Sequence, residues 1–155
     1  MLLGPTTYKL EFDTTKVLKV SGPGEAKTFR GSAAQRIPKL YVLAVKSNPV
    51  YVGVTRQPMG NRLRYGFSAT GKHGYHGYAW RRGLSSGELD IWTLDPARRD
   101  TDSRDIETVE AEVVFLIRQR SGQWPRFQTE IHFHPSTEDH REAARAVLEH
   151  YTLSC

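Results

Sequence analysis

The stretch that decides the fold runs from Lys39 to Thr55 and reads KLYVLAVKSNPVYVGVT. Two runs of aliphatic, β-branched and aromatic residues, 39–45 and 49–55, lie on either side of a polar connection at 46–49 that contains a proline. Runs of this kind are typical of strands, and a short connection with turn-forming residues joins antiparallel neighbours. The sequence therefore predicts a β-hairpin in the first half of the chain.

The hydrophobic pattern on both sides of the hairpin predicts a mixture of strands and helices. Alternation within 8–20 favours one or two short strands, and the Gly-, Ser- and Ala-rich stretch 21–36 favours a loop with one helical turn. After the hairpin we expect the start of a helix at 61–69, a glycine-rich loop at 71–77, a strand at 88–94, a charged linker at 95–104, a helix at 105–120, a strand at 127–134 and a helix at 136–151. Ser136 and Asp139 form a plausible capping box for the last helix.

These elements predict an α+β fold with a small, mainly antiparallel sheet flanked by helices. A chain of 155 residues corresponds to one domain, which we expect at 37–155 and ending in the helix 136–151. Residues 1–36 form an N-terminal extension that adds a strand or contacts a ligand.

The composition excludes several classes of protein. The one cysteine, Cys155, rules out an internal disulfide framework and a zinc site built from cysteines. No stretch approaches the roughly 18 consecutive apolar residues of a membrane helix, and the N-terminus has no basic start followed by an apolar run. We therefore expect a cytoplasmic protein without a membrane partner.

Basic charge is concentrated in one window of the sequence. From Ala26 to Gly87 there is no Asp or Glu, whereas this window holds eleven of the 22 Lys and Arg residues and five of the seven tyrosines. Cations interleaved with aromatic rings suit a polyanion, because each bound phosphate releases counterions and the rings stack on unpaired bases. A solvated basic face that serves only solubility is the alternative. The candidate nucleic-acid contacts are Lys46, Arg56, Arg64, Lys72 and Arg81.

The hairpin and the elements after it carry the residue types that phosphodiester hydrolysis needs. That reaction uses a carboxylate to hold a divalent metal, an arginine to neutralise charge on the phosphate, and a base to activate water. The hairpin carries Tyr41 and Tyr51, and Arg62 follows in the next element. In the helix at 105–120, Glu110 and Glu112 flank the apolar stripe on opposite shoulders, and periodicity does not choose between them.

The order of these pieces resembles the GIY-YIG nuclease family over about residues 38–133. The motifs that carry the resemblance are, in order, Lys39-Leu40-Tyr41, Tyr51-Val52-Gly53, Asn61-Arg62-Leu63, Glu112 within EVVFLIR, and Pro125-Arg126-Phe127-Gln128. The first motif keeps only the tyrosine of its family counterpart, and Gln128 stands where the family has asparagine. Four residues after the arginine the family usually has histidine or tyrosine, but this chain has Gly66.

The resemblance implies a role for each matched residue in an endonuclease. Tyr41 helps to activate the attacking water, Tyr51 lines the site, and Arg62 holds the scissile phosphate. Glu112 binds one Mg²⁺ or Mn²⁺ ion. Gly53 and Gln128 support the site, Gln128 either by positioning Glu112 or simply by ending a strand. Tyr65 or His76 stands in for the side chain missing at Gly66.

The expected partner is DNA, with RNA left open, and the protein is a monomer or a homodimer. The rival hypothesis is a nucleic-acid-binding module of the same fold that has lost catalysis; it is favoured by the degenerate first motif, by Gly66 and by Gln128.

Overall fold

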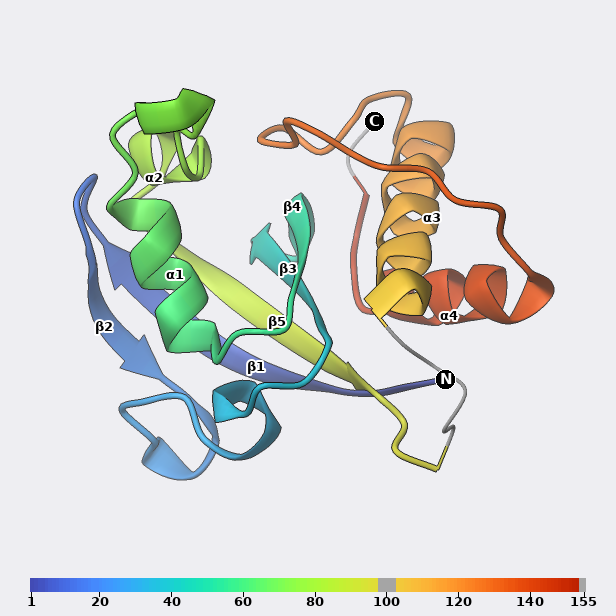
Figure 1. The fold of residues 1–155 in the computed structure, drawn as a ribbon, viewed down its shortest axis with the longest axis horizontal. Coiled ribbons are helices and arrows are strands. Elements are labelled where there is room, and N and C mark those ends of the chain that lie inside the picture. The colour runs from blue at the N-terminus through green and yellow to red at the C-terminus, as the bar shows by residue number, and fades with distance from the viewer. Residues whose placement is uncertain (98–102, 154–155) are drawn as a thin grey trace.

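A five-stranded antiparallel sheet forms the centre of the computed structural model, which describes residues 1–97 and 103–153 (Figure 1). The order of the strands across the sheet is β2-β1-β5-β3-β4. Their bounds are β1 Leu2–Phe12, β2 Val17–Ser21, β3 Lys39–Val45, β4 Asn48–Thr55 and β5 Ser86–Leu94. The predicted hairpin is confirmed as β3 and β4, which pair antiparallel with Tyr41 opposite Gly53.

Helices cover both faces of this sheet (Figure 1). The bounds are α1 Met59–Phe67, α2 Trp80–Gly83, α3 Ser103–Ser121 and α4 Glu138–Leu148, with short 3₁₀ turns at Pro23–Glu25, Gly31–Ala34 and Lys72–Gly74. Helices α1 and α2 lie on one face, and α3 with α4 packed on it lies on the other. The α+β class and the small sheet flanked by helices are confirmed.

Strand β3 explains why the sequence of the hairpin is so apolar. Tyr41 and Leu43 enter the core beneath α1 and α2, whereas Leu40 and Val42 enter the core beneath α3 and α4. Because the strand lies inside the sheet and both of its faces are covered, neither face needs polar residues. The alternation along the strand therefore decides which side chains reach the tyrosine-rich side of the sheet.

The N-terminal strands belong to this same sheet. β1 lies between β2 and β5, and its residues Tyr8, Leu10 and Phe12 enter the core on the α1 side. Residues within 1–36 therefore supply two of the five strands, as the prediction of strands in 8–20 allowed.

Two local predictions are wrong. No strand forms at 127–134. Phe127 and Gln128 bind the edge of β4, and the segment after them has no neighbouring strand among the described residues. The alternation of apolar and polar residues is therefore not enough to make this segment a strand. The last helix is capped by Thr137, whose hydroxyl accepts from the His140 amide at 3.5 Å, while the His140 ring accepts from the Thr137 amide at 3.0 Å. This capping box is shifted by one residue from the predicted Ser136 and Asp139 because histidine serves at its third position.

In the described ranges, 1–97 and 103–153, no helix combines the length and the apolar character needed to cross a bilayer. Part of the charged linker expected at 95–104, residues 98–102, lies outside the described residues.

Candidate active site

The hairpin brings Tyr41 and Tyr51 together on the α1 side of the sheet. Their ring centroids are 6.0 Å apart. Tyr41 is fully buried and Tyr51 is half-buried. A Cβ atom at Gly53, opposite Tyr41, would lie 2.6 Å from the Tyr41 Cζ and 2.7 Å from its hydroxyl oxygen. Only glycine leaves this space, so the Tyr-Val-Gly sequence of β4 is what allows the Tyr41 ring to lie across its neighbouring strand.

A third tyrosine, Tyr78, completes the cluster. Its hydroxyl lies 2.9 Å from that of Tyr41, and its ring stacks on Trp80 with the centroids 4.6 Å apart. The ring also covers Gly66 of α1, where an added Cβ would lie 2.9 Å from the Tyr78 Cζ and closer still to two other ring carbons. Tyr78 thus fills the space that a side chain at position 66 would need. We call Tyr41, Tyr51 and Tyr78 the tyrosine cluster.

Arg62 of α1 lies against this cluster. Its guanidinium carbon is 4.7 Å from the centroid of the Tyr78 ring, and Nη1 donates to the Tyr75 hydroxyl at 2.9 Å. Arginine stays charged in proteins, and stacking on a ring leaves its other N–H groups able to bind a phosphate. No ion pair holds Arg62 within the part of the chain that the structure describes. A half-buried cation without a carboxylate is therefore available to an anionic ligand.

Burial sets the protonation of the tyrosines. It raises the pKa of Tyr41 and of Tyr51 well above 10, although the charge of Arg62 acts in the opposite direction. Burial raises the pKa of Tyr78 as well. The three hydroxyls are thus protonated at neutral pH and serve as hydrogen-bond donors and as a relay. One of them becomes a base only when a further positive charge is nearby.

Among the predicted carboxylates, Glu110 is the one whose charge acts on a tyrosine of the cluster. Burial, with a smaller contribution from Glu107, raises the pKa of Glu110 to about 8. A negative charge on Glu110 in turn raises the pKa of Tyr51, although burial and Tyr41 raise it more. Within the described residues, Glu110 has no hydrogen-bond or ion-pair partner. At neutral pH this carboxyl is mostly protonated, and a bound cation would favour its ionised form.

Glu112 lies on the other flank of α3. Two residues along a helix turn the side chain by about 160°. This puts Glu112 on the side of Asp105, whose carboxylate contacts the His140 ring of α4 at 2.7 Å. The assignment of the metal to Glu112 stays a prediction from the resemblance, whereas the burial of Glu110 and the effect of its charge on Tyr51 favour Glu110.

Gln128 supports the strand next to the site rather than a glutamate. Its Oε1 accepts from the Val52 amide and its Nε2 donates to the Val52 carbonyl, both at 3.0 Å. The amide of Phe127 donates to the Val50 carbonyl at 2.9 Å. The Gln128 side chain thus pairs with the edge of β4 as a neighbouring strand would, and together with the Phe127 amide it fixes the backbone on both sides of Tyr51. No contact with Glu112 is found in the described part of the chain.

The structure does not bring His76 into the cluster. The His76 ring is exposed and lies over Gly71, within the loop that follows α1. Tyr65 does not fill the position either, because its ring stacks on Tyr75 outside the cluster. Tyr78 occupies the space beside Gly66, which neither candidate reaches.

Of the predicted nucleic-acid contacts, four are exposed and one is not. Lys46, Arg56, Arg64 and Lys72 lie at the surface, with Arg56 donating to the Ser103 hydroxyl at 2.7 Å. Arg81 is a correction: it is 4% exposed, and its guanidinium donates to the backbone carbonyls of Phe67, Ala69 and His76. Arg81 is therefore a structural residue that ties α1 to the loop after it.

Sequence reasoning missed Tyr75 and Tyr78 as site residues, and it left Glu110 open as the alternative to Glu112, which the resemblance chose. The available signals were two tyrosines in a glycine-rich loop and a glycine where the family has a large side chain. Together they favour a tyrosine of the loop as the residue whose ring lies beside Gly66.

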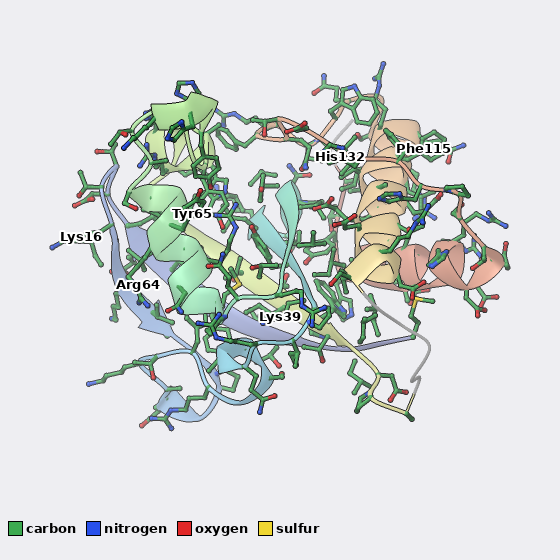
Figure 2. The ribbon with its side chains drawn as sticks, in the orientation of Figure 1. Lys16, Lys39, Arg64, Tyr65, Phe115 and His132 are labelled. Atoms are coloured by element: carbon green, nitrogen blue, oxygen red, sulfur yellow. The ribbon has the colours of Figure 1, made fainter. Side chains whose placement is uncertain are left out.

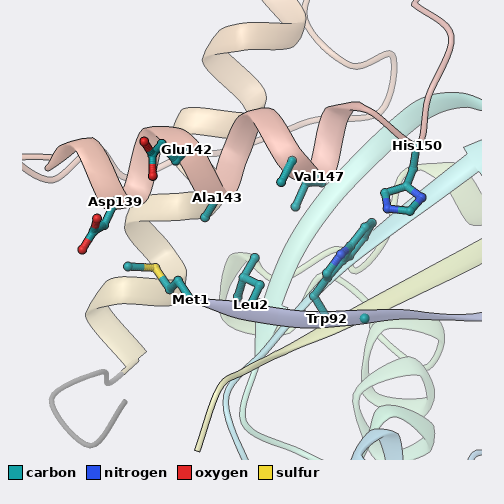
Figure 3. Close-up of a pocket in the computed structure, with 10 residues that line it drawn as sticks. Met1, Leu2, Trp92, Asp139, Glu142, Ala143, Val147 and His150 are labelled. Atoms are coloured by element: carbon teal, nitrogen blue, oxygen red, sulfur yellow. The ribbon is translucent and has the colours of Figure 1, made fainter. Parts of the chain in front are cut away.

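A pocket between β1 and α4 is lined by no residue of the tyrosine cluster (Figure 3). Leu2 and Trp92 of the sheet lie on one side of it and Val147 of α4 on the other, and Asp139 and Glu142 of α4 also line it. These two carboxylates do not favour a phosphate. Within the residues that the structure describes, no group of three or more His, Cys, Asp or Glu side chains is placed to hold a metal ion.

Comparison of the chain with family models, with curated proteins and with solved structures finds no match.

Proposed function

We propose that the protein is a metal-dependent endonuclease of the GIY-YIG type that hydrolyses DNA phosphodiester bonds. The observation that carries the proposal is the position of Arg62 against the tyrosine cluster. Tyr41, Tyr51 and Arg62 lie on three successive elements, β3, β4 and α1, and the resemblance relates them by their order in the sequence. Their meeting on one side of the sheet is what the reaction needs.

Each residue has a role that its surroundings allow. Arg62 binds the scissile phosphate and stabilises the charge that develops on it during attack. Tyr51, half-buried, is the tyrosine of the hairpin that can contact water, whereas Tyr41 is enclosed and acts behind it. Tyr78 holds the Tyr41 hydroxyl at 2.9 Å and is a positioning residue in this scheme.

The cofactor in this proposal is Mg²⁺ or Mn²⁺. Mg²⁺ is commonly held by one or two carboxylates together with substrate phosphate and water, so a single half-buried glutamate fits it. Glu110 is the residue that we assign to it, with Glu112 as the alternative from the resemblance. When bound, the ion supplies positive charge that lowers the pKa of a water molecule and neutralises the phosphate.

The rival function is nucleic-acid binding without catalysis. It is favoured by the complete burial of Tyr41 and by the finding that no group of three or more metal-ligating side chains occurs among the residues that the structure describes. Both hypotheses predict binding to DNA that weakens as salt is raised, but only the nuclease predicts cleavage. The single cysteine agrees with a cytoplasmic protein, and either a monomer or a homodimer suits the proposal.

Cleavage of supercoiled plasmid in Mg²⁺ or Mn²⁺ tests the proposal, with Arg62→Ala compared against Arg64→Ala. Both arginines belong to α1, but Arg64 is exposed and contacts the Asn61 side chain. We expect the wild type to nick the plasmid and Arg62→Ala to lose about 10²–10³ in maximal rate, whereas Arg64→Ala, which removes a candidate DNA contact, requires more protein but keeps a maximal rate within a few-fold of wild type. Binding without metal-dependent cleavage by the wild type contradicts the nuclease and supports the binding module.

A further inference from the structure

Two tyrosines form an aromatic surface beside Arg62. Tyr65 of α1 and Tyr75 of the following loop stack with their centroids 4.8 Å apart and their planes at 23°. Tyr65 is 55% exposed, so much of this stack faces solvent. Figure 2 shows Tyr65 and Arg64 along α1. We call Tyr65 and Tyr75 the aromatic platform.

The platform and Arg62 form one unit. The Arg62 guanidinium carbon is 5.8 Å from the Tyr65 centroid and 6.0 Å from the Tyr75 centroid, and Arg62 donates to the Tyr75 hydroxyl at 2.9 Å. That hydrogen bond fixes the orientation of the Tyr75 ring. A phosphate bound by Arg62 therefore lies beside the platform, at the separation at which the base of the same or the next nucleotide can stack.

The charge around the platform also suits a nucleic acid. Arg64 and Lys72 are exposed on α1 and on the loop, and neither segment contains an Asp or Glu. A structural role for the stack, which closes the loop against α1, accounts for the buried part of Tyr75 but not for the exposure of Tyr65. Exposed aromatic area costs free energy in water, and a flat ring beside cations is how proteins bind unpaired bases.

We propose that the aromatic platform binds an unpaired nucleobase next to the phosphate held by Arg62. The inference rests on the proposed function in assigning that phosphate to Arg62. It makes the preferred substrate a nucleic acid with at least one unstacked nucleotide at the cleavage site, such as a single strand, a flap or a branch point. Fully paired, unbent duplex offers no base to the platform.

The test compares binding of short fluorescent oligothymidylate with that of an oligomer of equal length made of abasic nucleotides. The two probes carry the same phosphate charge and differ only in the bases. Anisotropy is measured in Ca²⁺ to suppress cleavage. We expect the wild type to prefer the thymidylate by about 5- to 150-fold, from about 1–3 kcal/mol per stacked base.

Variants separate stacking from folding. Tyr65→Ala is expected to lose most of the preference, whereas Tyr65→Phe keeps the ring and retains it. Phe133→Ala is the matched control, since Phe133 is 59% exposed and lies away from the platform in the segment before α4. Denaturation curves of each variant show whether the fold is kept. If Tyr65→Ala keeps both the fold and the wild-type preference for bases, the platform is overturned.

A parallel cleavage assay keeps this proposal distinct from the nuclease proposal. A wild type that cuts DNA but shows no preference for bases overturns the platform alone. A wild type that prefers bases through Tyr65 but cuts nothing supports the platform and contradicts the nuclease. Failure to bind either probe overturns the platform.

Discussion

Replacing Gly66 with alanine tests whether the Tyr78 ring fills the space beside Gly66. Gly60 is the matched control, because it belongs to the same helix and an added Cβ there meets only Arg64 Nη1 at 3.5 Å and Phe29 Cδ2 at 3.8 Å. Helix propensity alone predicts that both substitutions stabilise the protein by up to about 1 kcal/mol. The contacts around the two glycines predict instead that Gly66→Ala destabilises the protein and Gly60→Ala stabilises it.

The size of the difference follows from the packing around Gly66. The new methyl group would overlap the Tyr78 ring, which is held between Trp80, the Tyr41 hydroxyl and Arg62 and is 2% exposed. Overpacking of a buried group costs about 1–3 kcal/mol. The gain in helix propensity is shared by both variants, so their difference isolates this cost. We expect Gly66→Ala to be about 1–3 kcal/mol less stable than Gly60→Ala.

Equilibrium unfolding in urea measures this difference from the midpoints, provided that the slopes of the free energy against urea agree. Tryptophan fluorescence is a suitable probe because Trp80 stacks on Tyr78. Equal stability of the two alanine variants would refute the argument that Tyr78 occupies the space beside Gly66.

Three further predictions concern buried polar groups. The Tyr41–Tyr78 hydrogen bond predicts a coupling of about 1 kcal/mol in a double-mutant cycle of the two phenylalanine variants, and additive losses in unfolding free energy would contradict the bond. Arg81→Ala is expected to lower the unfolding free energy by about 2–4 kcal/mol, because three backbone carbonyls lose their donor. Arg82→Ala, at the exposed neighbouring position, is expected to change it little. Thermal melts in which the two variants coincide would contradict this prediction. Burial lowers the pKa of Lys39 to about 8, so the unfolded chain binds more protons than the folded protein between about pH 8 and 10.5. The unfolding free energy is therefore expected to rise over this range by up to about 3 kcal/mol relative to Lys39→Met. Parallel pH profiles of the two proteins would contradict the lowered pKa.

Local patterns predicted most of the fold. The hairpin at 39–55 is confirmed because β3 is buried on both faces, which makes its apolar run continuous and easy to recognise. The helix α3 is confirmed because its stripe of apolar residues packs against the sheet and α4. Each of these signals is contained within a few turns of chain. The strand expected at 127–134 is wrong because pairing depends on a neighbour, which the local sequence does not specify.

The site was predictable only in part. Tyr41, Tyr51 and Arg62 lie together as the resemblance implies, since two belong to one hairpin and the third follows it closely. Glu110 and Glu112 lie on opposite flanks of α3, and only the packing of α3 makes the Glu110 charge act on Tyr51 and puts Glu112 on the side of Asp105, which contacts α4. Tyr78 reaches Gly66 through a turn of the glycine-rich loop, a contact that no periodicity encodes.

Single-turnover cleavage of labelled DNA in Mg²⁺ by the wild type, Glu110→Gln and Glu112→Gln tests whether the protein is a nuclease with Glu110 as its metal ligand. We expect metal-dependent cleavage by the wild type, a loss of about 10²–10³ in rate for Glu110→Gln, and a rate within a few-fold of wild type for Glu112→Gln. Loss confined to Glu112→Gln would contradict the assignment of Glu110 while keeping the nuclease. A wild type that binds DNA and leaves it uncut would contradict the nuclease itself.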